Sequence, residues 1–357
     1  MAAEVPSLMY ATLAWSAIHT TDSDRHIDGI SNPSRMITSL KGKSVKHLRT
    51  EIQELGMKHG DALLATVRTL CQCEIHSGSD GNSVWRVHVK GAKALMTTIK
   101  RSQSSGCSRS RLLCRWYASL ESLAALTPST HESAQVPLEA LSEQASESVY
   151  LDDYNGYSTD LSFILGKIGA TAELQGRCCT LFMSEEVKAH ADELQKSVYH
   201  IMERDNNQVP VFYPGVAENL CQQDILDYSL CNQAYQHTAL IHIQRRLRNH
   251  PSDTPMIQDS VKKVIECARA ITLAYGLSPA IVLTTPLFTA GCEALGEDRK
   301  AIRDLLCRLH DKLKIRNIRL SLEVLEDHWV EDGYDGDWRG LLRMLRPYVI
   351  PTKLTVR

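Results

Sequence analysis

Cysteine is the residue type in this chain with the clearest capacity for chemistry, because paired thiolates can hold zinc. The chain contains 11 cysteines, at positions 71, 73, 107, 114, 178, 179, 221, 231, 267, 292 and 307. A two-metal thiolate cluster needs paired Cys-x-x-Cys groups, and that spacing does not occur in the sequence. Cys71 and Cys73 would point about 200° apart on a helix. We therefore predict no metal site and no disulfide framework, with thiols acting mainly as small apolar fillers.

The usual catalytic motifs are also missing. The sequence has no Gly-x-Ser-x-Gly turn, no Gly-x-x-x-x-Gly-Lys loop and no Gly-x-Gly-x-x-Gly loop. His131-Glu132 lacks the second histidine of a metalloprotease helix, and the acidic stretch 331–337 lacks the alternating ligands of a calcium loop. We predict no catalytic residue and no cofactor, so the chain is not expected to be an enzyme.

Two basic clusters could contact an anionic partner. The sharper one is Arg245-Arg246-Leu247-Arg248, which we interpret as cations that complement the negative end of a helix. The weaker one, interpreted as a solvated helix start, consists of Lys41, Lys43, Lys46 and Arg49. The whole chain has 40 basic and 42 acidic residues and a net charge of −2, which argues against its gripping DNA by itself.

Apolar residues recur at helical spacing along most of the chain. This pattern predicts helices over residues 61–75, 84–99, 112–126, 161–174, 185–203, 222–248, 256–275, 280–295 and 299–315, followed by an apolar stripe from Ile315 to Trp329. The segment 127–150 is rich in Ser, Glu, Gln and Pro, which favours a mobile surface loop. The fold class is therefore predicted to be all-α, a large multi-helix bundle forming one domain over residues 1–357.

No apolar run is long enough to cross a membrane, so no membrane association is expected. The apolar N-terminal stretch, Val5 to Ile18, follows Glu4 and has no basic segment before it. That arrangement is unlike a secretory signal, and it predicts an intracellular protein.

Several sequence blocks, taken in order, resemble the regulatory domain of fungal zinc-cluster transcription factors, the fungal-specific transcription factor domain. The most similar block is 286–294, Pro-Leu-Phe-Thr-Ala-Gly-Cys-Glu-Ala, within the stretch 284–306. Three further blocks are the early helix 63–78, the helix Trp85–Leu95 and the long central helix 235–247. The closing block runs from Leu322 to Trp329 and is followed by Trp338. The resemblance covers roughly residues 5 to 345.

The residue types in these blocks indicate a role in helix packing. Gly91-Ala92 and Ala290-Gly291 are small residues inside helices, which predicts that another helix approaches closely, since a helical glycine costs about 1 kcal/mol relative to alanine. The three tryptophans of these blocks are expected to be core anchors: Trp85, Trp329 and Trp338.

The resemblance implies a nuclear transcription regulator that acts through its helical domain, in a secondary-metabolite or stress-response pathway. It implies either a homodimer or a partner protein that supplies DNA contacts, because the sequence starts about where the regulatory domain starts in the family. Two alternatives stay open. One is a ligand-binding or scaffolding module with a small apolar ligand, and the other is a recruited all-α biosynthetic enzyme.

Overall fold

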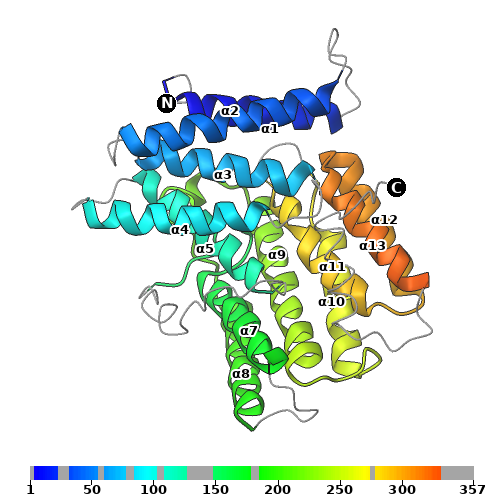
Figure 1. The fold of residues 1–357 in the computed structure, drawn as a ribbon. Coiled ribbons are helices and arrows are strands. Elements are labelled where there is room, and N and C mark those ends of the chain that lie inside the picture. The colour runs from blue at the N-terminus through cyan, green and yellow to red at the C-terminus, as the bar shows by residue number, and fades with distance from the viewer. Residues whose placement is uncertain are drawn as a thin grey trace. The chain divides into compact units, whose positions relative to one another are not determined.

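We describe a computed structural model of the chain, which covers residues 4–22, 32–54, 60–77, 84–102, 108–126, 148–177, 185–273 and 278–330. Every regular element in these residues is a helix, and the extended pairings are isolated bridges at Leu151 (Figure 1). The all-α prediction is confirmed. Among the described helices, none combines the length and apolar character that a membrane span requires.

The chain divides into two compact units. Of the described residues, unit 1 contains those up to Leu120 and Lys314–Leu320, and unit 2 contains those from Glu121 to Leu313 and from Ser321 to Val330. A single domain over 1–357 stays a prediction. The predicted loop 127–150 lies outside the described residues except for its last three positions.

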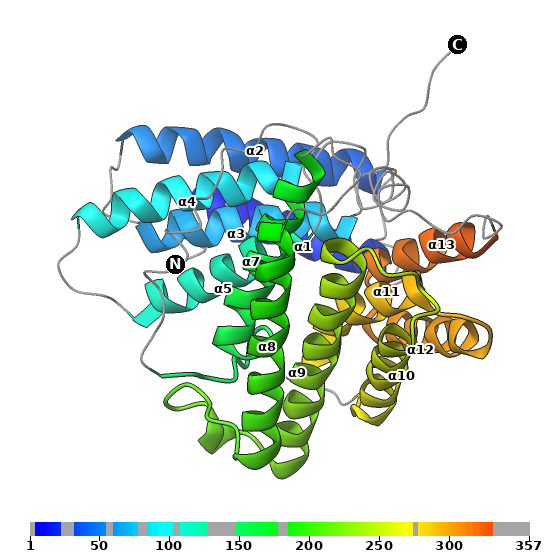
Figure 2. The ribbon, with the colours of Figure 1, turned by 90° about the horizontal axis from the view of Figure 1, so that it is seen from below.

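Unit 1 is a layer of helices built around an apolar seam. Its main helices are α1 (Pro6–Asp22), α2 (Pro33–Glu54), α3 (Gly60–Ser77), α4 (Val84–Ser102) and the first part of α5 (Ser108–Ala125). α1 packs against α2 and α3, and α3 packs against α4 (Figures 1 and 2). Ala14, Ile18 and Cys73 form one buried cluster of this seam, with Trp15 packed against it.

A buried carboxylate also joins three helices of unit 1. Glu51 of α2 accepts hydrogen bonds from the backbone N–H of Ser7 at 3.0 Å and from the Ser7 hydroxyl. The Ser7 hydroxyl also lies 3.1 Å from Thr66 Oγ1 of α3, and Ser44 Oγ donates to Ser7 O at 2.8 Å. These bonds fix the start of α1 against α2 and α3, because a buried carboxylate is costly unless it is hydrogen-bonded.

The sequence analysis did not predict α1, and it treated residues 41–49 as a helix start although they lie in the middle of α2. Both helices carry signals that could have revealed them. Each begins with proline at its first position, Pro6 and Pro33, where the missing N–H costs nothing. Asn32 also caps α2, since its side-chain oxygen accepts from the N–H of Arg35 at 2.9 Å.

Unit 2 is centred on a long buried helix, as the sequence pattern predicted. α9 (Gln222–His242) is buried on most of its sides and continues into a π-helical turn, η3 (Ile243–Leu247). Around it pack α7 (Thr159–Arg177), α8 (Glu185–Asn207), α10 (Pro255–Ala270) and α11 (Thr284–Glu293). The unit also contains the short helices η2 (Ala217–Asn219) and η4 (Pro279–Leu283), then α12 (Glu297–Leu313) and most of α13 (Arg316–Val330).

Local chemistry sets several helix limits in unit 2. At the start of α9, Asp224 accepts a hydrogen bond from the N–H of Cys221 at 2.8 Å, forming a capping box. Past the ends of helices, Asn249 and Lys314 adopt left-handed backbone angles, with φ of 55° and 52°. A left-handed residue is a common way to end a helix and satisfy its last carbonyls.

The small-residue prediction is right for one of the two glycines. A Cβ placed on Gly291 would lie 2.6 Å from Leu325 Cδ1 of α13, so α11 and α13 approach closely there. A Cβ on Gly91 would meet no atom within 4 Å, so the close approach predicted for α4 at this residue is wrong. The sequence analysis also missed Gly169, where an added Cβ would collide with the Ala125 carbonyl.

The predicted tryptophan anchors are less buried than expected. Trp85 and Trp329 are only half-buried, while Trp338 lies outside the described residues. Trp329 acts through a polar contact instead, because its Nε1 donates to the carbonyl of Gly291 at 2.8 Å. The buried tryptophan of the described residues is Trp116 in α5.

Candidate functional site

The described cysteines form no cluster suited to a metal. All eight of them are free thiols, and no group of three or more potential ligands occurs among the residues that the structure describes. Cys71 and Cys73 are both buried, and burial raises the pKa of the Cys73 thiol to about 12. Such a thiol stays protonated and unreactive. The remaining three cysteines, Cys107, Cys178 and Cys179, lie outside the described residues.

The arginines of the cluster 245–248, in η3 and just after it, each have a partner within the protein. Arg245 pairs with Glu293 of α11, with Nε 2.9 Å from Oε2. Arg246 donates to the carbonyl of Leu126 at 2.6 Å, and Arg248 pairs with Asp192 of α8 at 2.5 Å. Each guanidinium thus has a partner within unit 2, so this cluster is a poor candidate for an external anion site.

Glu293 is the centre of a buried polar group. Besides Arg245, it accepts a hydrogen bond from Ser252 Oγ at 2.5 Å. Gln258 Nε2 then donates to the carbonyls of Ser252 and Glu293, at 2.5 and 2.9 Å. Arg245 also donates to the carbonyl of His250. The group joins the end of α9, the start of α10 and the end of α11, and it leaves the carboxylate facing its own chain.

A π-helical turn often marks a functional position, which makes η3 a candidate. Its bonds include Arg248 N–H to Ile243 O at 3.1 Å, the wider spacing of a π-helix. The neighbouring His242 is buried, and its Nε2 lies 3.5 Å from Thr289 Oγ1. Burial, helped by the charge of Arg246, holds the pKa of His242 well below its usual value. A neutral imidazole enclosed in this way can satisfy packing but has no access to a substrate.

A second network joins α7, α8 and α9 through Asp205. Asn232 Nδ2 and Gln236 Nε2 of α9 each donate to Asp205 Oδ2 at 2.7 Å. Arg204 pairs with the other oxygen, Oδ1, at 2.7 Å. Asn232 Oδ1 in turn accepts from the N–H of Ser158 at 2.9 Å, just before the start of α7.

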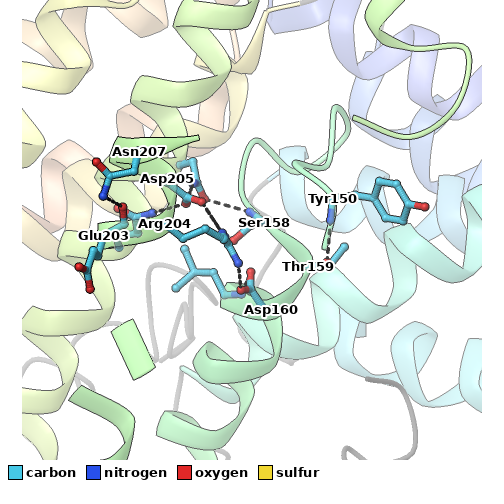
Figure 3. A network of polar contacts seen from close by, with 11 residues as sticks. Tyr150, Ser158, Thr159, Asp160, Glu203, Arg204, Asp205 and Asn207 are labelled. Carbon is cyan, nitrogen blue, oxygen red and sulfur yellow. Dashed lines mark hydrogen bonds and ion pairs between the residues drawn. The ribbon is translucent and has the colours of Figure 1, made fainter. Parts of the chain in front are cut away.

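Arg204 bridges two carboxylates in this network. Its guanidinium also pairs with Asp160, in the first turn of α7 (Figure 3). Burial lowers the pKa of Arg204, but the hydrogen bonds and charges of Asp160 and Asp205 raise it more, so the net shift is upward. The oxygens and donors of the network are used within the chain, and their role is to lock three helices together. The sequence analysis did not single out any of these residues.

The basic group 41–49 is different, because it lies mostly at the surface. Lys41 is the exception and pairs with Glu74 of α3 at 2.7 Å. Lys43, Lys46 and Arg49 are exposed on α2. The Nζ atom of Lys43 also lies 5.5 Å from the centre of the Tyr10 ring, and this contact helps to fix the position of the lysine side chain. Among the residues that the structure describes, Lys43, Lys46 and Arg49 therefore form an exposed basic group that is available to a partner.

Comparison with known proteins gives the family of the chain. The sequence matches the family described as "Fungal specific transcription factor domain" over residues 1–349. The chain belongs to this family. No curated protein and no solved structure matches it significantly.

Membership of the fungal-specific transcription factor domain family fits the roles of the conspicuous sequence blocks. The block 286–294 is α11, whose Gly291 admits Leu325 and whose Glu293 holds Arg245. The block 235–247 ends in η3 and supplies Gln236 to the Asp205 network. These residues build the fold of this transcription factor domain and are not arranged around a reactive centre.

Proposed function

We propose that this chain regulates the transcription of fungal genes through its helical domain, acting in the nucleus. The observation that supports the proposal is the family match over residues 1–349, nearly the whole of the chain. The internal use of Glu293 and Asp205 agrees with it, since the buried polar groups hold helices together. We assign the chain no catalytic step, cofactor or metal.

Sequence-specific contact with DNA is assigned to a partner protein or to a homodimer that recruits one. The sequence has no Cys-x-x-Cys group with which to build a zinc cluster, and the arginines at 245–248 pair internally. Target genes in secondary metabolism or stress response are part of the proposal, on the strength of the family resemblance alone. No described feature favours a small apolar ligand or an enzymatic role as a second function.

A tethering experiment tests the regulatory role directly. The chain is fused to a heterologous DNA-binding domain and placed upstream of a reporter gene in a fungal host. We expect reporter expression to change at least several-fold relative to the DNA-binding domain alone. A fusion carrying Glu293→Gln, which disturbs the fold, is expected to lose the effect, while one carrying Asp192→Asn at an exposed position keeps it. Unchanged reporter expression with a stable, nuclear fusion would contradict the proposal.

A further inference from the structure

One helix face in unit 1 presents hydrogen-bond donors, and none of the side chains that the structure describes on this face is a carboxylate. On α2, the side chains of Arg35, Ser39, Lys43, Lys46, Arg49 and Gln53 are all exposed. They follow one another at spacings of three or four residues, which is the condition for lying on a single helix face. The acidic side chain of α2 that the structure describes, Glu51, points the other way and is buried against Ser7.

The charge of this face contrasts with that of the chain. The whole sequence is nearly neutral, with 40 basic and 42 acidic residues. Between Pro33 and Thr50, however, the sequence contains no aspartate or glutamate at all. The segment therefore has a local excess of positive charge although the net charge of the chain is close to zero. A polyanion is attracted by this local electrostatic field.

The composition of the face favours a nucleic-acid backbone over an acidic protein. Hydrogen bonds to phosphates come from Arg, Lys, Ser, Thr and Gln side chains, which are the types found here. Protein interfaces need buried apolar or aromatic anchors, and the exposed large apolar residue on α2 is Ile52, near its end. Single-stranded nucleic acid is bound by stacking on aromatic rings, but the nearby aromatic residue, Tyr10, already stacks on His47.

The dimensions of the face also suit a duplex. Fourteen residues separate Arg35 from Arg49, so with a rise of about 1.5 Å per residue the cations extend over about 21 Å. Double-stranded DNA carries one negative charge for about every 1.7 Å of its axis, so a helix of this length can meet several phosphates. α2 lies at the margin of unit 1, against α1 and α3 (Figures 1 and 2).

We propose that the exposed face of α2 formed by Arg35, Ser39, Lys43, Lys46, Arg49 and Gln53 binds the phosphate backbone of double-stranded DNA without reading its sequence. This contact goes beyond the proposed regulatory function. It adds sequence-independent affinity for DNA to the sequence-specific affinity of the partner protein. Because it depends only on the purified chain, it can fail while the tethering experiment succeeds.

Fluorescence anisotropy with the full chain and labelled duplexes of unrelated sequence tests the proposal. We expect dissociation constants on the order of 10⁻⁵ M at low salt, the same for each duplex. With four cations on phosphates, affinity should fall by about 100-fold between 50 and 200 mM KCl, because each contact contributes about 0.9 to the logarithmic salt slope. The absence of binding at 50 mM KCl would overturn the proposal.

A matched pair of triple variants separates this face from net charge. The variant Lys43→Gln, Lys46→Gln and Arg49→Gln should bind at least tenfold more weakly and lose about 2.7 from the magnitude of the salt slope. The control removes three exposed cations of unit 2 with the same change in net charge: Lys196→Gln, Lys262→Gln and Arg269→Gln. If the two variants weaken binding equally, the α2 face is not the binding site.

Two further polyanions, polyglutamate and duplex RNA, distinguish between the possible classes of partner. Polyglutamate at the same concentration of charge should displace labelled DNA poorly, and a duplex RNA of equal length should bind no more tightly than DNA. Equal displacement by polyglutamate would assign the face to acidic proteins, and tighter RNA binding would assign it to RNA. Circular dichroism and urea midpoints that match those of the wild type confirm that both triple variants are folded, since the substituted side chains are exposed.

Discussion

Arg245 and Glu293 form an ion pair inside unit 2, with Nε and Oε2 2.9 Å apart and side chains only 7% and 1% exposed. The pair connects the π-helical end of α9 with the last residue of α11. Both partners come from sequence blocks that resemble the family pattern, Glu293 from the most similar one. The relationship explains why a run of arginines, which by sequence could face a partner, is used inside the fold.

Removing one member of this pair should be costly. Glu293→Gln leaves the charge of Arg245 buried without its counter-charge, so we expect a loss of about 3–5 kcal/mol in the free energy of unfolding. Urea denaturation followed by circular dichroism measures it. The control Asp192→Asn, at the more exposed pair with Arg248, should cost less than about 1 kcal/mol.

The same pair can be tested by replacing both members. Arg245→Met combined with Glu293→Leu removes both buried charges, so the double variant should be more stable than the Glu293→Gln single variant. A double variant that is less stable than the single one would show that the pair contributes mainly through shape.

Asp205 should contribute to stability through its full negative charge. In Asp205→Asn the new amide donates where Asn232, Gln236 and Arg204 also donate, so one donor loses its acceptor. We expect a loss of about 1–3 kcal/mol in the free energy of unfolding. Glu203→Gln, at an exposed position on the same helix, is the control and should change stability by less than about 0.5 kcal/mol.

The two glycines of the family-like blocks should respond to alanine in opposite directions. Gly291→Ala forces the added Cβ against Leu325, so we expect a loss of about 1–3 kcal/mol. Gly91→Ala meets no neighbour within 4 Å and improves helix propensity, so a gain of up to about 1 kcal/mol is expected. Thermal unfolding of the two variants, measured side by side, distinguishes them. If both variants were more stable than the wild type, α11 and α13 would have to separate at little cost in free energy.

His76 should make the protein less stable in acid. Burial, with the nearby charge of His19, lowers the pKa of His76 to about 4 from its ordinary value of 6.5. As the pH falls, the unfolded chain therefore takes up a proton before the folded chain does. The contribution of this group to stability is complete above the unfolded pKa of 6.5 and is lost as the pH falls toward 4.

The variant His76→Phe tests this prediction. Phenylalanine keeps a ring in edge contact with Trp15 and removes the titration. Urea midpoints measured between pH 4 and pH 7 should decline less steeply for the variant than for the wild type. His200→Gln removes an exposed imidazole and serves as the control. An unchanged slope in His76→Phe would contradict a role for this residue.

Much of the fold could be predicted because a helix is a local structure. The periodic apolar residues of the segments 185–203 and 299–315 correspond to α8 and α12, within a few residues at each end. The failures have physical causes. The beginning of α2 was missed because the outer face of this helix is polar, and its apolar residues are too few to dominate the pattern. Gly91 was misread because a helical glycine can face open space as well as a neighbouring helix.

The sequence by itself determined the helical class of this protein, its family and the absence of a Cys-x-x-Cys zinc cluster from its residues, because these depend on local spacing. Only the tertiary structure decided which basic side chains pair with carboxylates of the protein and which are exposed to solvent. Arg245 meets Glu293 because η3, which follows α9, packs beside the end of α11, while Lys46 and Arg49 have no carboxylate partner among the described residues around α2. Charge pairing is a property of helix packing, and residue order alone does not contain it.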